Sequence, residues 1–287
     1  MLKLTSWPRL AAAITITGLL IIWLVGYTLG KPSPHQFKRT PDGAIDIEIP
    51  SQPNGYLSGW LFPVDEPIAA AILMHGIRSN RGQMLSRAKH LQSLGIMSLA
   101  FDFQAHGQSP GKVIGLGYLE ASNAQSALAY LQSKAPGLPN IAIGVSMGGA
   151  AALLADPALN VDVLILEAVY TDIDKAIANR LEARIPGGRI LTPILSGLIK
   201  LRLGVSSKHI APIKHTDRIT AATLILSGSA DEHTTVEDTQ KLYDALATTK
   251  SLYLFDNAGH VDLQAFDNDT YWSIVQPFIW EHLFEDS

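Results

Sequence analysis

Short apolar runs alternate with helical patterns along most of the chain, and this alternation limits the folds open to it. The runs Ala69–His75, Val161–Val169 and Thr223–Ser227 are mostly apolar, as in parallel strands covered on both faces. Helical spacing separates them, and Ala44–Pro50 and Tyr56–Pro63 are expected to form two antiparallel strands before the first run. The pattern predicts an α/β fold with a mostly parallel sheet and helices on both faces.

An uncharged segment lies near the amino terminus. The 21 residues from Leu10 to Gly30 carry no charge, and as a helix they would extend about 31 Å, close to the roughly 30 Å hydrocarbon core of a bilayer. We therefore expect residues 10–30 to form one transmembrane helix, as a membrane anchor or signal-anchor. A cleaved signal peptide is an alternative, although no clear cleavage site follows the run. A buried core helix is another.

The charges that flank this segment are nearly balanced and indicate its orientation only weakly. Lys3 and Arg9 lean towards an amino terminus inside the cell, which would place the rest of this single-pass membrane protein on the non-cytoplasmic side. Residues 31–43, which include the proline-containing segment Lys31–Thr40, are expected to be a linker. Residues 44–287 are expected to form the folded domain.

One insertion interrupts the alternation of strands and helices. Between Tyr170 and Arg218 almost fifty residues show no strand pattern, which is too long for a passive loop. Helical spacing recurs over Ile173–Leu181 and Ile190–Leu203. We predict a helical cap over about residues 171–218, while extra helices packed on the edge of the sheet are the alternative.

Composition excludes several classes of function. The net charge of −4 and pI near 6.1 give no basic footprint, so no nucleic-acid partner is expected. The chain has no cysteine, which excludes disulfides, thiolate metal sites and a cysteine nucleophile.

The segment Gly144-Val145-Ser146-Met147-Gly148 lies where a predicted strand meets a predicted helix. In such a turn the serine hydroxyl stands clear of the sheet, and crowding favours residues without a Cβ atom, here Gly144 and Gly148, two positions on either side. The pattern alone is common by chance. Its position between a strand and a helix makes Ser146 the candidate nucleophile.

A serine hydroxyl needs a base, and the base needs an orienting acid. His260 follows the predicted strand Leu252–Phe255, and Asp231 follows the predicted strand Thr223–Ser227. Both therefore lie at carboxyl ends of strands, where ligands of open α/β sheets bind. We predict His260 as the base and Asp231 as the acid.

Other carboxylates compete with Asp231 for this role. Glu232 is its neighbour, and Glu167 ends another predicted strand. Asp262 is too near His260 in the sequence to orient its ring easily.

A tetrahedral intermediate also needs hydrogen-bond donors for its oxyanion. The backbone N–H of Met147, at the start of its helix, is the first candidate. The second is the backbone N–H of Ile77, in the loop that begins His75-Gly76-Ile77. Gly76 is expected to let this backbone approach the substrate, and His75 to support the loop.

Together these motifs resemble those of the α/β-hydrolase superfamily, whose nucleophile, acid and base follow in this chain order. The motifs are His75-Gly76, Asp102-x-x-x-His106-Gly107-x-Ser109, GVSMGG at 144–149, GSADEH at 228–233 and AGH at 258–260. The resemblance covers about residues 44–286 and is greatest to bacterial esterase-like, lipase-like or serine-aminopeptidase-like members with a helical cap. Asp102 and His106 are expected to hold their loop. Gln104-Ala105 replaces the Arg-Gly of many relatives, which affects loop packing.

The resemblance implies an α/β-hydrolase fold and hydrolysis through an acyl-enzyme on Ser146, with no cofactor and no metal. We expect the substrate to be a small-molecule or lipid-like carboxylic ester. A peptidase or amidase and a thioesterase are alternatives, and a catalytically silent binding protein on this fold is a further one. The oligomeric state is left open.

Overall fold

The computed structural model describes residues 7, 11–13, 16–18 and 30–284. The helix predicted over residues 10–30 lies mostly outside these residues. Within the described part of the chain, no single helix combines the length and apolar character needed to cross a membrane. A bent pair, Gly188–Leu203 and Ser207–Arg218, meets those criteria jointly by length and composition, with an angle of 80° between its two parts.

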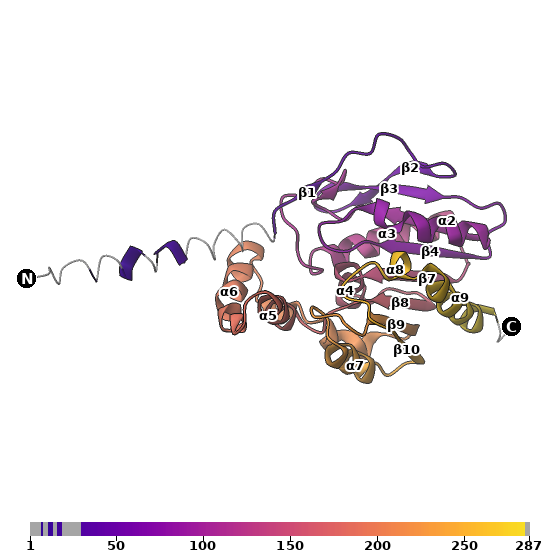
Figure 1. The fold of residues 1–287 in the computed structure, drawn as a ribbon. Helices are drawn as coiled ribbons and strands as arrows, with labels where there is room; N and C mark the ends of the chain where they lie inside the picture. The colour runs from indigo at the N-terminus through magenta and orange to yellow at the C-terminus, as the bar shows by residue number, and fades with distance from the viewer. Residues whose placement is uncertain (1–6, 8–10, 14–15, 19–29, 285–287) are drawn as a thin grey trace, which may run out of the picture.

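The described residues form one main sheet of eight strands (Figure 1). Across the sheet the order is β10-β9-β8-β7-β4-β5-β3-β2. β2 and β3 form an antiparallel pair, β3 is antiparallel to β5, and the other neighbours are parallel. The strands are β2 (Ile45–Ser51), β3 (Gly55–Phe62), β4 (Ala69–Met74), β5 (Ile96–Phe101), β7 (Asn140–Val145), β8 (Val163–Glu167), β9 (Ala222–Gly228) and β10 (Lys250–Phe255). The mostly parallel sheet predicted from the sequence is confirmed.

β4, in the middle of the sheet, is apolar at every position because helices cover both faces. In β4, Ile72 and Met74 pack into one core and Leu73 into the other. All three are fully buried, and each such side chain contributes about 1.5–3 kcal/mol to folding.

Two sets of helices provide this cover. The first core includes side chains of α3 (Glu120–Lys134), α4 (Met147–Leu154) and α7 (Val236–Ala245). The second includes side chains of α2 (Leu85–Ser93), α8 (Leu263–Phe266) and α9 (Asn268–Phe284). The 3-10 turn η1 (Arg81–Met84) precedes α2.

The insertion between β8 and β9 is helical. It contains α5 (Ile173–Arg184), η2 (Gly188–Leu191), α6 (Thr192–Leu203), η3 (Ser207–His209) and η4 (Pro212–Arg218). Asp172 starts α5 because its side chain accepts the N–H of Lys175, and Gly204 ends α6 in the left-handed conformation. In Figure 1, α5 and α6 lie on the opposite side of the domain from α9 and the carboxyl terminus.

Residues 31–43, expected as a linker, contact the domain closely. β1 (Ser33–Pro34) pairs with β6 (His106–Gly107) in a parallel two-stranded ladder. The Phe37 ring lies 4.5 Å from that of Trp60, and the Arg81 guanidinium stacks on both rings. This packing occurs because the segment carries an aromatic side chain that contacts both the ring of Trp60 and the guanidinium of Arg81.

Candidate active site

Ser146 occupies the sharp turn between β7 and α4. Its φ of 49° lies in the left-handed region, which is strained for a residue with a side chain. The Ser146 N–H donates to the Glu167 carbonyl at 2.7 Å and fixes the turn to β8. A Cβ atom on Gly144 would lie 2.5 Å from the Gly149 nitrogen, and one on Gly148 would lie 2.4 Å from the Met74 oxygen. Both glycines are therefore required by close backbone approach.

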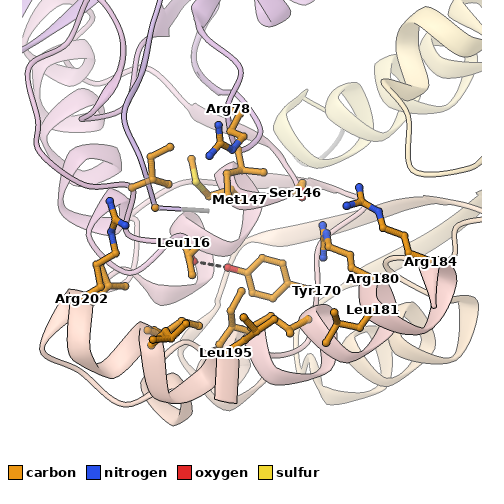
Figure 2. A pocket seen from close by; sticks show the side chains of 18 residues that line it. Arg78, Leu116, Ser146, Met147, Tyr170, Arg180, Leu181, Arg184, Leu195 and Arg202 are labelled. Carbon is orange, nitrogen blue, oxygen red and sulfur yellow. Dashed lines mark hydrogen bonds between the residues drawn. The ribbon is translucent and has the colours of Figure 1, made fainter. Parts of the chain in front are cut away.

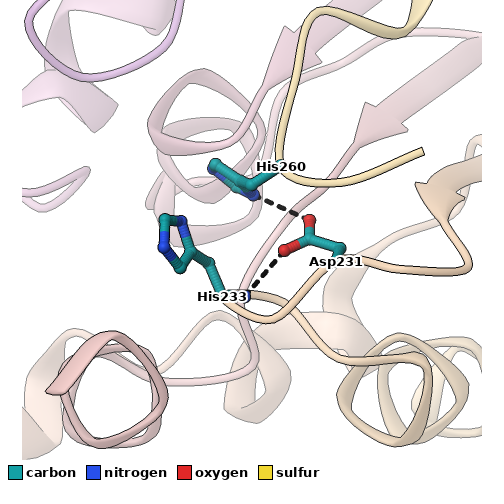
Figure 3. A group of neighbouring side chains, drawn as sticks. All are labelled: Asp231, His233 and His260. Carbon is teal, nitrogen blue, oxygen red and sulfur yellow. Dashed lines mark hydrogen bonds and ion pairs between the residues drawn. The ribbon is translucent and has the colours of Figure 1, made fainter. Parts of the chain in front are cut away.

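The structure brings Ser146, His260 and Asp231 together although 114 and 29 residues separate the contacting pairs. The Ser146 Oγ lies 3.4 Å from His260 Nε2, and His260 Nδ1 lies 2.7 Å from Asp231 Oδ2. Figure 3 shows the carboxylate of Asp231 facing the His260 ring. With Nδ1 protonated, His260 donates to the carboxylate and presents a basic Nε2 to the serine. The Ser–His contact is longer than an ordinary hydrogen bond, and contacts of this kind shorten when a substrate binds.

Asp231 is held as an anion by several donors. Its Oδ1 accepts the backbone N–H groups of His233 and Thr234 at 2.7 and 2.9 Å, and the Thr234 hydroxyl donates to Oδ2. Burial raises the pKa of the Asp231 carboxyl, but the hydrogen bonds from His260 and Thr234 and the charge on His260 hold this pKa below its ordinary value. The carboxylate is therefore ionised and orients His260.

The loops that carry Asp231 and His260 are joined directly. The Ala230 N–H donates to the Ala258 carbonyl at 2.9 Å. A Cβ atom on Gly228, at the end of β9, would lie 2.1 Å from that same carbonyl oxygen. The absence of a side chain at Gly228 thus lets the two loops pack together.

The three carboxylates that compete with Asp231 in the sequence form no hydrogen bond with the His260 ring. Both oxygens of Glu167 bind the Arg87 guanidinium, and Glu167 Oε1 also accepts the Tyr271 hydroxyl. Asp262 binds the same guanidinium. Glu232 is exposed. Among the described carboxylates, Asp231 is the one hydrogen-bonded to the His260 ring.

The loop after β4 lies beside the serine. Ile77 and Met147 line the same cavity as Ser146, and neither backbone N–H has an acceptor among the described residues. His75 supports the loop, since its Nδ1 contacts the Gly76 carbonyl at 2.7 Å and its Nε2 accepts the Phe103 N–H at 3.1 Å. A Cβ atom on Gly76 would meet no atom closer than 3.7 Å, so crowding by the described residues does not require glycine there.

Asp102 and His106 hold their loop, as predicted. Asp102 accepts the backbone N–H groups of Arg81 and Gln108 and pairs with the Arg81 guanidinium. The His106 Nε2 accepts the Arg78 N–H at 3.2 Å. Gln104, which stands where many relatives have arginine, packs in the same loop. Its side chain accepts a hydrogen bond from the Asn54 amide, and its backbone N–H donates to the Asn123 side chain.

A cavity of about 400 Å³ opens over Ser146 between the sheet and the insertion (Figure 2). Its lining is mostly aliphatic, from α5, α6 and the loops after β4 and β6. Tyr170 lies near its middle, with its hydroxyl donating to the Leu116 carbonyl. Four arginines also line it, namely Arg78, Arg180, Arg184 and Arg202, and no acidic residue does so within the described chain.

Sequence reasoning missed several residues of this site. Thr234 has a local signal, a hydroxyl three residues after Asp231, as in a capping turn. Arg87 has no such signal, because its partners Glu167 and Asp262 lie 80 and 175 residues away. The cavity arginines lie on helical patterns that predict position but not the direction of a side chain.

One cluster has the composition of a metal site. Ligand atoms of Asp231, His233 and His260 lie within 4.8 Å of one another (Figure 3). A cation bound through His260 Nδ1 would displace the hydrogen bond to Asp231, so binding there would compete with the serine–histidine–aspartate arrangement. The hydrogen bonds of His260 to Asp231 and Ser146 fit the serine–histidine–aspartate arrangement better than a metal site.

Comparisons with known proteins agree with this geometry. Residues 65–205 match the family model "Serine aminopeptidase, S33". The uncharacterized protein YqkD of Bacillus subtilis is 27% identical over 94% of both chains, and human monoglyceride lipase is 28% identical over 43% of both. The Pyrococcus furiosus esterase Pf2001 superposes with a TM-score of 0.72 at 23% identity, covering 88% of this chain and all of that one. The chain therefore has the fold of the α/β-hydrolases and is similar to the S33 serine aminopeptidases over residues 65–205.

Proposed function

We propose that the protein is a serine hydrolase that cleaves carboxylic esters through an acyl-enzyme on Ser146. The observation that carries this proposal is the continuous contact from Ser146 Oγ to His260 Nε2 and from His260 Nδ1 to Asp231. The strained turn at Ser146 holds this contact at the floor of the cavity.

The reaction follows from these positions. His260 takes the proton of Ser146 as Oγ attacks the ester carbonyl, and Asp231 stabilises the imidazolium that forms. The N–H groups of Ile77 and Met147 stabilise the oxyanion. His260 then protonates the leaving oxygen, and the acyl group remains on Ser146. Water, deprotonated by His260, releases the carboxylic acid and restores the serine.

The cavity favours an apolar acyl group. Its wall is mostly aliphatic side chains of α5 and α6, which gain free energy by covering a hydrocarbon chain. The names of two similar proteins, an esterase and a monoglyceride lipase, support an ester as the substrate. We propose that the helical insertion acts as a cap over the acyl group of the substrate.

The matched family suggests a peptidase acting on a free amino terminus as the alternative. Such a substrate carries an ammonium group, which needs a carboxylate near the nucleophile. The described cavity residues include four arginines and no carboxylate. The positive charge of these arginines disfavours a substrate with an ammonium group, so we favour esters over peptides as substrates.

A fluorophosphonate probe tests the reaction class. Labelling of the full chain that is lost in Ser146→Ala supports the proposal, whereas a folded protein that stays unlabelled and does not hydrolyse esters contradicts it. p-Nitrophenyl esters of graded chain length, tested beside aminoacyl anilides, decide between ester and amide. Faster turnover of the anilides would favour the peptidase.

We also propose that residues 10–30 anchor the enzyme in a membrane, with the domain on the non-cytoplasmic side. The uncharged run supports an anchor. Gly30, its last residue, lines the cavity that holds Ser146, and its carbonyl accepts the Ile114 N–H at 3.0 Å. An anchored chain would thus place the cavity near the bilayer. A topology reporter fused to the carboxyl end tests the orientation, and activity in the soluble fraction would contradict anchoring.

A further inference from the structure

The charge of the cavity goes beyond what ester hydrolysis requires. Arg78, Arg180 and Arg184 line it, and none of them forms an ion pair with a carboxylate of the described residues. Among the residues that the structure describes, the Arg180 guanidinium donates to the Ala176 carbonyl, at 3.1 Å, and to no carboxylate. Guanidinium groups near one another repel unless an anion lies between them. A cavity built only for a neutral ester gains nothing from this arrangement.

Asn179, the neighbour of Arg180 in α5, ties that helix to the loop that follows Asp231. The Asn179 side chain donates to the His233 carbonyl at 3.1 Å and to Asp238 at 2.7 Å. The His233 ring in turn lies 5.0 Å from the His260 ring. The same hydrogen bonds therefore hold α5, the helix that carries Arg180, against the loop of Asp231 and His233.

Electrostatic effects agree with this placement. Burial lowers the pKa of Arg180, and the charges of Tyr170 and Asp231 oppose that effect. Burial and the charge of Arg180 together lower the pKa of His233 to about 4. Figure 2 shows Arg180 and Arg184 at one end of the cavity, Arg78 above Ser146, and Arg202 at the other end.

The base marks the side from which the leaving group departs, because His260 must protonate its oxygen. The charges of Arg180 and Arg184 both act on His233. The His233 ring lies 5.0 Å from that of His260, so we place both arginines on that side. We propose that the preferred substrate is an acyl ester whose alcohol carries a phosphate monoester, with the phosphate bound by Arg180 and Arg184 and the acyl chain in the aliphatic part of the cavity.

A phosphate monoester suits this site better than a single carboxylate. It carries about −1.5 to −2 charges at neutral pH and three acceptor oxygens, and arginine forks bind it through paired hydrogen bonds. In the reaction the bond from Ser146 Oγ to the acyl carbon forms as the bond from that carbon to the ester oxygen breaks. The proton of Ser146 passes through His260 to that oxygen, and the phosphorylated alcohol leaves. Water then releases the carboxylic acid.

This inference rests on the proposed function, and its test compares two substrates that differ only in the phosphate. Release of lauric acid is measured for 1-lauroylglycerol and for 1-lauroylglycerol 3-phosphate, with the full chain in detergent micelles. We expect a higher kcat/KM for the phosphate ester. Arg180→Gln and Arg184→Gln should each lower the ratio of the two kcat/KM values at least about tenfold, mainly through KM, as loss of a charge-assisted contact implies.

Three controls make the result decisive. Arg189→Gln removes an exposed arginine of the same insertion, which pairs with Glu182 and lies outside the cavity lining, and should leave the ratio unchanged. Arg180→Lys should recover part of the preference. Thermal unfolding identifies any variant that fails to fold, in which case Arg184→Gln, at an exposed position, remains informative.

Two results would overturn the inference. Wild-type protein that hydrolyses p-nitrophenyl laurate but shows no preference for the phosphate ester contradicts it and leaves the proposed function intact. The same holds if both folded variants keep the wild-type ratio. Absence of hydrolysis of every ester together with absence of fluorophosphonate labelling would instead remove the proposed function, and this inference with it.

Discussion

Arg87 and Glu167 form a buried two-point ion pair, with each side chain 1% exposed. The backbone carbonyl of Glu167 accepts the N–H of Ser146. The same guanidinium binds Asp262, two residues after His260. Arg87, on α2, therefore connects the strand that fixes the turn at Ser146 with the loop that carries His260.

Replacement of Arg87 by alanine should destabilise the fold strongly. The change leaves the Glu167 carboxylate buried without its counterion, which typically costs about 3–5 kcal/mol. Urea denaturation of the full chain in micelles measures the loss. Arg189→Ala, which removes an exposed ion pair with Glu182, should leave the midpoint unchanged. A similar midpoint for both variants would show that the buried pair contributes little.

The identity of the acid is tested by exchanging two carboxylates for amides. Asp231→Asn should lower kcat by roughly 10³–10⁴-fold, because the neutral amide no longer fixes the His260 tautomer or stabilises the imidazolium. Glu167→Gln should affect stability more than the pH profile of kcat, since Glu167 contacts Arg87 and Tyr271. The opposite pattern would assign the acid to Glu167.

The sequence predicts the strands of the sheet well because each buried strand is visible as a short apolar run. The run Ala69–Met74 is apolar at every position, as a strand covered on both faces must be. It also predicts which residues meet at the site, because Asp231 and His260 follow parallel strands whose carboxyl ends share one edge. Both inferences need only short stretches of sequence and the rule that parallel strands end at the same edge of a sheet.

Other features depend on partners far apart in the chain. The Arg87 network joins α2, β8 and the start of α8, and no local pattern specifies those pairs. Residues 31–43 look like a spacer in composition, yet Phe37 finds a site between Trp60 and Arg81. The direction of Arg180 depends on how α5 docks through Asn179. Tertiary packing decides all three.

The serine turn should reject even one methyl group. In Gly148→Ala the new Cβ would lie 2.4 Å from the Met74 carbonyl oxygen, which forces the α4 start away from β4. We expect loss of most activity and a lower melting temperature. Gly197→Ala is the matched control, since a Cβ there meets nothing within 4 Å and helix propensity predicts a gain of about 0.5–1 kcal/mol. Full activity of Gly148→Ala would contradict the crowded turn.

Buried histidines should make the fold sensitive to acid. Burial lowers the pKa of His75 to about 4 and that of His106 to about 3, the latter also through the charge of His75, against an ordinary value of 6.5. Between those values the unfolded chain binds protons that the folded chain does not. The two neutral histidines therefore cost the fold nothing above pH 6.5. As the pH falls below 6.5, the free energy of unfolding decreases by up to about 1.4 kcal/mol per pH unit for each histidine.

Glu120 opposes this loss and offers a direct test of it. Burial raises the pKa of its carboxyl from 4.5 to about 7, although the Gly115 and Gly117 N–H groups act against burial. Between pH 4.5 and 7 the folded chain therefore binds the extra proton, so this group stabilises the fold as the pH falls. Glu120→Gln removes the offset. Urea denaturation between pH 7.5 and 4.5 should then show a steeper loss of stability in Glu120→Gln than in the wild type, by up to about 1.4 kcal/mol per pH unit. Equal slopes would mean that Glu120 is ionised in the folded protein, and a flat profile in both would remove the role of the histidines.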